Sequence, residues 1–104
     1  MNIEHDLNQA MALCQKQKFN EAIKLFEKIV LEDPSVADAW RGMAKAKMML
    51  NRLDEAIVDN NKALQADPSN LWALILMGNI YAHKQELDKA MAYYEKVVEC
   101  HPKD

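Results

Sequence analysis

The sequence predicts an all-α solenoid of three helix-turn-helix units, with six helices in all. The first reason is that residues of one type return every 34 positions, which is typical of stacked supersecondary units rather than of one globular core. The recurring residues are Ala22, Ala56 and Ala90, then Lys28, Lys62 and Lys96, then Pro34, Pro68 and Pro102. The second reason is composition, because the chain has only two glycines and three prolines and is otherwise rich in helix formers.

Each unit is expected to pair two helices. The first pair covers about 4–15 and 20–32, the second 37–50 and 54–66, and the third 71–84 and 88–100. In the second helix of a pair, apolar residues such as Ala22 and Phe26 recur at three- and four-residue steps, which predicts one buried face. The middle copy is poorer, because Asp59, Asn60 and Asn61 interrupt its apolar stripe.

Short polar residues and prolines mark the helix boundaries. Asn20, Asp54 and Asp88 stand at one equivalent place, where their side chains can accept hydrogen bonds from the first turn, so we expect them to cap the second helices. Asp33-Pro34-Ser35 and Asp67-Pro68-Ser69 are expected to separate the repeats, because proline cannot continue the helix behind it.

The arrangement resembles the tetratricopeptide repeat (TPR) family, whose pattern is W-x₂-L-G-x₂-Y in the first helix, A-x₃-F in the second and then a proline. The third repeat matches best, at Met77, Gly78, Tyr81, Ala90, Tyr94 and Pro102, with Leu74 in the tryptophan slot. The second matches at Trp40, Met43, Ala44, Ala56, Ala63 and Pro68, and the first at Ala10, Leu13, Ala22, Phe26 and Pro34. The departures are Lys47 in the tyrosine slot, Asn60 in the phenylalanine slot and Asp6 in a tryptophan slot. The resemblance implies one domain over 1–104, a right-handed α-solenoid with repeats at about 3–36, 37–70 and 71–104.

The resemblance also implies a non-catalytic protein–protein interaction module, in which the first helices line a concave groove for a peptide or helix of a partner protein. Co-chaperones of this family grip a C-terminal carboxylate with a clamp of Lys, Asn and Arg side chains. The matching places in this chain hold Leu7, Met11, Gly42, Trp72 and Leu76. A heat-shock chaperone adaptor of that type is therefore disfavoured.

The same register places a mixed set of residues on or beside the concave face: Leu7, Met11, Arg41, Lys45, Met48, Trp72, Ile75, Leu76 and Asn79. Methionines and a tryptophan suit an apolar or amphipathic ligand. We expect Trp72 and Leu76 to anchor the partner. We expect Arg41 and Lys45 to attract an acidic flank. The alternative is that Trp72 and Ile75 pack against the neighbouring repeat.

The last repeat of a solenoid exposes the face meant for its successor unless a cap covers it. Met91, Tyr94 and Val98 belong to the stripe that a following helix would cover. The favoured explanation is that the chain is part of a longer repeat protein. The alternative is self-association through this face, which would make the protein an oligomerising scaffold. A third function is a docking segment of a larger enzyme.

Composition and spacing argue against several other classes of function. The net charge of −3 is spread over the three repeats, which leaves no basic stripe for nucleic acid. The most apolar window, 71–80, is too short to span a bilayer. Cys14 and Cys100 fall in repeats that are not neighbours, and unpaired cysteines favour a reducing, cytoplasmic environment. Because metal-ligand spacing, a phosphate loop and a nucleophile motif are lacking, we expect no metal, no cofactor and no enzyme activity.

Overall fold

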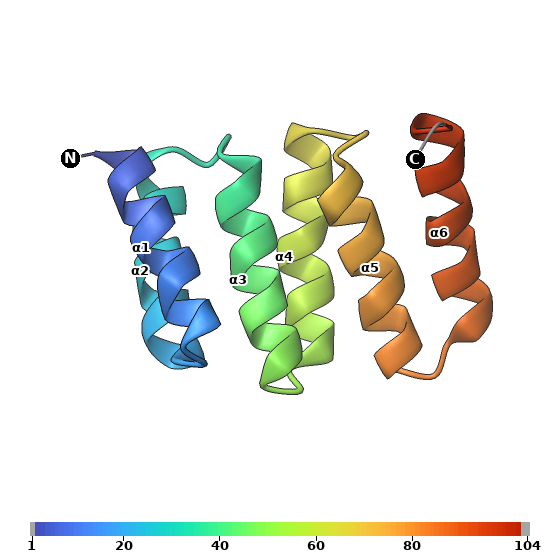
Figure 1. The fold of residues 1–104 in the computed structure, drawn as a ribbon, viewed down its shortest axis with the longest axis horizontal. Helices are drawn as coiled ribbons and strands as arrows, with labels where there is room; N and C mark the ends of the chain where they lie inside the picture. Colours follow the sequence, from blue (N-terminus) through green and yellow to red (C-terminus); the bar gives the residue numbers. More distant parts are fainter. Residues whose placement is uncertain (1, 103–104) are drawn as a thin grey trace.

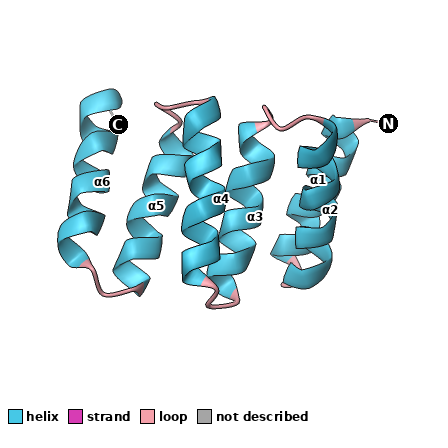
Figure 2. Ribbon diagram, turned by 180° about the vertical axis from the view of Figure 1, so that it is seen from behind, coloured by secondary structure: helices cyan, strands magenta, loops and turns pink. Residues whose placement is uncertain are grey.

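The structure, a computed structural model, describes residues 2–102, which form six α-helices and no strand in that range. Their bounds are α1 Ile3–Gln15, α2 Phe19–Glu32, α3 Ala37–Met49, α4 Leu53–Ala66, α5 Leu71–His83 and α6 Leu87–Cys100. Figure 1 shows them following one another in chain order along a body of 39 × 26 × 21 Å. Short loops join them throughout (Figure 2). The predicted all-α solenoid is confirmed, and each helix begins and ends within one residue of its predicted bounds.

The helices form two layers because each repeat packs on the next. Helix α3 contacts both α1 and α5, so the first helices of the three pairs share one face. The second helices α2 and α4 each contact the first helix of the following repeat, α3 and α5. This nearest-neighbour packing is what makes a repeat array a continuous core.

Small residues stand where the two helices of a pair meet. They are Ala10 and Ala22 in the first repeat, Ala44 and Ala56 in the second, and Gly78 and Ala90 in the third, all of them buried. Without bulky side chains at these places, the helix axes approach closely and the larger residues fill the space between repeats. Phe26, Ile29 and Met77 are among the most completely buried of those larger residues.

The first helix of every pair ends in the same tight turn. One residue in each turn has a positive φ: 63° at Gln17, 62° at Asn51 and 64° at Gln85. The next residue then donates its N–H back to a carbonyl five positions earlier: Lys18 to Leu13, Arg52 to Lys47 and Glu86 to Tyr81, at 2.8–2.9 Å. This is a Schellman motif, which satisfies the last free carbonyls of a helix.

The expected caps of the second helices are wrong. Helices α2, α4 and α6 begin at Phe19, Leu53 and Leu87, and the residues before them make no side-chain cap hydrogen bond in the part of the chain described. Asn20, Asp54 and Asp88 therefore lie inside the first turn. The physical reason is that the Schellman turn leads the backbone directly into the next helix, two residues earlier than a cap at these positions would. In α4, Arg52 holds the first turn instead by an ion pair with Glu55 at 2.7 Å.

Three polar residues of the middle repeat, Lys47, Asp59 and Asn60, are buried. Lys47 Nζ lies 2.7 Å from Asp59 Oδ2, and the two side chains are 11% and 10% exposed. Asn60 Nδ2 donates to the carbonyl of Ala73 in α5 at 2.7 Å, whereas its Oδ1 has no hydrogen-bond partner within residues 2–102. Lys47 and Asp59 therefore compensate each other's charge, and the Asn60 amide is satisfied on its nitrogen.

Candidate partner-binding groove

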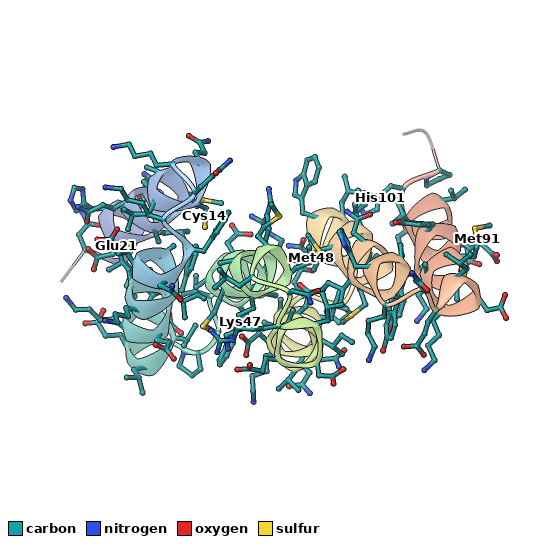
Figure 3. The ribbon with its side chains drawn as sticks, turned by 90° about the horizontal axis from the view of Figure 1, so that it is seen from below. Cys14, Glu21, Lys47, Met48, Met91 and His101 are labelled. Atoms are coloured by element: carbon teal, nitrogen blue, oxygen red, sulfur yellow. The ribbon has the colours of Figure 1, made fainter. Side chains whose placement is uncertain are left out.

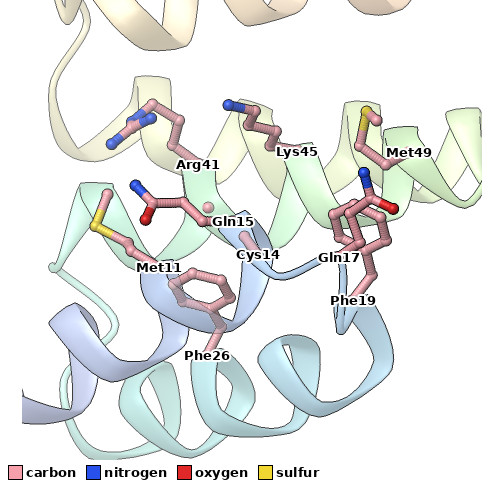
Figure 4. A pocket seen from close by; sticks show the side chains of 10 residues that line it. Met11, Cys14, Gln15, Gln17, Phe19, Phe26, Arg41, Lys45 and Met49 are labelled. Carbon is pink, nitrogen blue, oxygen red and sulfur yellow. The ribbon is translucent and has the colours of Figure 1, made fainter.

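The face formed by α1, α3 and α5 carries a groove made of two hollows. The first hollow, of about 320 Å³, lies between the first and second repeats. Its lining comprises Met11, Cys14, Gln15, Gln17, Phe19, Phe26, Arg41, Gly42, Lys45 and Met49. Figure 4 shows Met11 and Arg41 toward one end of this hollow and Phe19 and Met49 toward the other.

The second hollow, of about 220 Å³, lies between the second and third repeats. Its lining comprises Arg41, Lys45, Met48, Trp72, Ile75, Leu76 and Asn79. Arg41 and Lys45 line both hollows. They are four residues apart on α3, which places them one turn apart on the same helix face. The groove is therefore two apolar depressions on either side of a cationic ridge.

Gly42 determines the floor of the first hollow. A Cβ atom built at Gly42 would lie 2.4 Å from Cζ of Phe26, far inside van der Waals contact. Only glycine lets the Phe26 ring lie directly against the backbone of α3. Gly42 stands at a place where the carboxylate clamp of co-chaperones has an asparagine. In this chain it has a packing role, because it admits an aromatic ring from the preceding repeat.

The charge of the groove is positive, although the chain as a whole is acidic. No Asp or Glu lines either hollow among the described residues. Arg41 Nη2 is 3.6 Å from Asp38 Oδ1, while its Nε is buried with no hydrogen-bond partner within residues 2–102. Lys45 is exposed and has no ion pair in that range. Lys45 is therefore left for an external anionic group, beside an Arg41 whose ion pair with Asp38 is long.

Cys14 contributes a half-buried thiol to the first hollow. Burial raises the pKa of the Cys14 thiol, and the positive charge of Lys45 opposes that increase in part. The thiol is therefore held in its neutral form at neutral pH and acts here as a small apolar surface. It also gives a chemical reporter inside the groove.

Eight of the nine residues predicted on or beside the groove line one of the hollows: Met11, Arg41, Lys45, Met48, Trp72, Ile75, Leu76 and Asn79. The ninth, Leu7, is half-buried and packs against the core of the first repeat. Trp72 is 61% exposed, so most of its ring is not buried against the neighbouring repeat. The role of all nine in binding stays a prediction.

Sequence reasoning missed much of the first hollow. Its lining also includes Cys14, Gln15, Gln17, Phe19, Phe26 and Met49, which the repeat register does not place in the groove. A four-residue spacing could have found two of them, since Gln15 follows Met11 and Met49 follows Lys45 by one helical turn. Gln17 lies in the turn between α1 and α2 and Phe19 begins α2, and the periodicity does not predict the path of that turn.

A second apolar surface lies on α6. Met91 and Val98 are 56% and 65% exposed, and Leu87 beside them is 64% exposed. Figure 3 shows Met91 on the outer side of α6, at the opposite end of the molecule from Cys14. Tyr94 differs from its predicted partners, because it is half-buried and its hydroxyl donates to Asn79 Oδ1 at 2.5 Å.

The described range, residues 2–102, also bears on metal binding and on membrane crossing. This range contains no group of three or more His, Cys, Asp or Glu side chains that could hold a metal ion. None of the helices described in it is both long enough and apolar enough to cross a membrane.

Several known proteins are similar to this chain in sequence. The chain is 31% identical over 84 residues to sperm-associated antigen 1 of Mus musculus, and the matched region covers 81% of this chain and 9% of that protein. It is 27% identical over 101 residues to Hsp70-Hsp90 organizing protein 3 of Arabidopsis thaliana, covering 97% of this chain and 18% of that protein. The chain therefore spans less than a fifth of the length of these relatives.

A solved structure has the same fold. It is the first TPR of Spaghetti (RPAP3) bound to the HSP90 peptide SRMEEVD, and it superimposes with a TM-score of 0.91 over 98% of this chain and 81% of that one, at 24% identity. Two tetratricopeptide repeat models match the sequence, at residues 7–71 and 61–104. With its three repeats, its small residues between paired helices and these matches, the chain belongs to the tetratricopeptide repeat family.

Proposed function

We propose that this chain is a binding module that holds a segment of a partner protein in the groove formed by α1, α3 and α5. The observation that carries this proposal is the 61% exposed indole of Trp72 beside the second hollow. A large exposed aromatic side chain next to an apolar depression is the usual anchor of a protein interface. The free thiols of Cys14 and Cys100 suit a reducing compartment such as the cytoplasm.

Two of the similar proteins support a peptide-binding role. The Spaghetti domain is bound to a peptide of HSP90, and the Arabidopsis relative is named as an organizer of Hsp70 and Hsp90. The groove of this chain differs from the carboxylate clamp of co-chaperones, since apolar residues and Gly42 replace the clamp side chains. We therefore propose a partner segment bound by apolar contacts rather than by a clamped C-terminus.

Selection from a displayed library of random 12-residue peptides tests this function. We expect the chain to enrich peptides whose binding is lost on Trp72→Ala. The matched control is Leu31→Ala, which removes a side chain that is 85% exposed on α2 and lines neither hollow. Thermal unfolding of both variants must stay close to that of the original chain. Peptides that bind the Trp72→Ala variant unchanged would place the binding site elsewhere.

A second candidate function is a self-associating scaffold, and the exposed side chains of Leu87, Met91 and Val98 favour it. These three residues leave an apolar surface on the outer helix, and a second copy of the chain could cover it. Groove binding remains the first proposal, because the groove combines shape, charge and an aromatic anchor, whereas the surface of α6 has apolar side chains alone.

Light scattering after size exclusion, over a tenfold range of concentration, separates the two functions. A constant mass near 11.9 kDa would rule out self-association of this chain. A larger species that is lost on Met91→Glu and Val98→Glu, but kept on Leu31→Glu, would make assembly the leading function. The Leu31 control introduces the same charge at another exposed apolar site.

A further inference from the structure

We infer that the segment bound in the groove carries an acidic side chain between two apolar side chains, the acidic one on Arg41 and Lys45 and the apolar ones in the two hollows. This inference rests on the proposed binding function and specifies the chemistry of its ligand. It differs from a carboxylate clamp because the recognised charge lies inside the segment, with apolar contacts on both sides.

The position of the acidic side chain follows from the ridge that divides the groove. Arg41 and Lys45 belong to the lining of both hollows, so any chain that occupies both must cross them. A ligand with a basic residue at the crossing would meet two like charges. A ligand with an apolar residue there would bury Lys45 without a partner and leave Arg41 with only its 3.6 Å approach to Asp38, which is costly.

The positive charges of Arg41 and Lys45 are incompletely paired within the described part of the chain. The side chain of Arg41 is mostly buried, at 16% exposure, and its only ion pair within residues 2–102 is the 3.6 Å approach to Asp38. Its Nε is buried and unpaired there. Lys45 is exposed and free of ion pairs over the same range. A carboxylate above α3 can therefore contact Lys45 directly and add to the field around Arg41.

The two apolar positions follow from the hollows themselves. The first has the Phe26 ring as its floor and methionines Met11 and Met49 in its lining, which adapt to side chains of different shape. The second is smaller and is bounded by Trp72 and Leu76. We expect a large side chain such as Phe, Leu or Met in the first hollow and a smaller aliphatic one in the second.

The peptide library gives the first test. Among peptides that depend on Trp72, we expect Asp or Glu to be enriched between two apolar residues. Lys45→Gln, at an exposed position without an ion pair in the described range, should weaken binding of the best of these peptides several-fold. Together with Arg41→Gln the loss should reach about tenfold or more, and the affinity of the original chain should fall as salt rises. Lys24→Gln on α2 is the matched control, since Lys24 is exposed and lines neither hollow.

The same selection separates failure of the inference from failure of the function. Trp72-dependent peptides that are neutral or basic at the crossing would overturn the acidic motif and leave groove binding intact. Absence of any Trp72-dependent peptide would overturn the function itself. Selection with an Arg41→Glu, Lys45→Glu variant should favour Lys or Arg at the crossing, and unchanged acidic sequences there would contradict the inference.

Cys14 supplies a test of the first hollow. In a Cys100→Ser variant, the reaction of the Cys14 thiol with a maleimide reports access to this hollow, because Cys14 is part of its lining. A bound peptide should slow this reaction several-fold, and the same peptide with its large apolar residue changed to Ala should protect much less. Full binding without protection would show that the first hollow stays empty.

Discussion

The first and middle repeats place opposite chemistry at the same point between their two helices. In the first repeat the two equivalent residues are Leu13 and Leu25, half-buried apolar side chains that pack on the core. In the middle repeat they are Lys47 and Asp59, an ion pair at 2.7 Å. The third repeat uses a stacked pair, Tyr81 and Tyr93, with ring centroids 5.7 Å apart.

The junctions between repeats differ in the same way. Phe26 of the first repeat fills its place by lying against Gly42, whereas Asn60 of the middle repeat donates a hydrogen bond to Ala73. Both side chains are fully buried. The comparison teaches that the small residues and the turns set the backbone geometry. The two side chains that face each other between the helices can therefore vary, as long as they match in polarity and charge.

The largest expected effect breaks the apolar junction. Phe26→Ala should lower the free energy of unfolding by about 4 kcal/mol, because a fully buried ring is lost and its cavity against Gly42 cannot be filled by the backbone. Urea unfolding followed by circular dichroism measures this. Phe19→Ala, in which a partly buried ring is lost, is the control and should cost clearly less. Equal losses would show that Gly42 and Phe26 are not the centre of this junction.

The next effect concerns the ion pair. Asp59→Leu alone should destabilise the protein by about 2–3 kcal/mol, because buried Lys47 is left with only the exposed carboxylate of Glu55, 4.0 Å away. The loss is smaller than for a fully buried pair because this second partner remains and the side chains are partly exposed. The same unfolding measurement applies.

The double variant Lys47→Leu, Asp59→Leu imitates the first repeat and sharpens the comparison. Its stability should return to within about 1 kcal/mol of the original chain or exceed it, because two charges no longer have to be desolvated. A double variant as unstable as Asp59→Leu would mean that the middle repeat needs the ion pair itself.

A smaller effect is expected at the polar junction. Asn60→Ala should cost about 1–2 kcal/mol, through loss of the 2.7 Å hydrogen bond to Ala73 and of buried contacts. Asn61→Ala, at the exposed neighbouring position, should change the free energy of unfolding by less than about 0.5 kcal/mol. If the two substitutions cost the same, the bond to Ala73 does not stabilise this junction.

The smallest effect, a gain, tests the turns that the repeats share. Gln85→Gly should stabilise the protein by about 0.5 kcal/mol, because glycine adopts the φ of 64° without the penalty that a Cβ brings. The entropy of glycine in the unfolded chain offsets part of this gain. The equivalent change Asn51→Gly should gain less, since asparagine already tolerates this conformation. If Gln85→Gly instead lowers the free energy of unfolding, the side chain of Gln85 makes a stabilising contact.

Most of the groove could be predicted because its residues share helix faces. Met11, Arg41 and Lys45 are placed by the repeat register alone, and the structure brings them to one hollow. The rest could not be predicted in this way. Gln17 and Phe19 reach that hollow through a turn, and the depth of its floor depends on a ring from α2 meeting Gly42 of the next repeat.

The sequence by itself determined the number and order of the helices, and their bounds to within one residue, because periodicity, small residues and prolines are local signals that recur every 34 residues. Only the tertiary structure decided that the second helices start at Phe19, Leu53 and Leu87, that Lys47 pairs with Asp59, and that Asn60 donates to the carbonyl of Ala73. The helix starts depend on the turn before them, and the two pairings join different helices. Periodicity reports which face of a helix a residue occupies, whereas the partner on that face depends on how closely the neighbouring helix approaches.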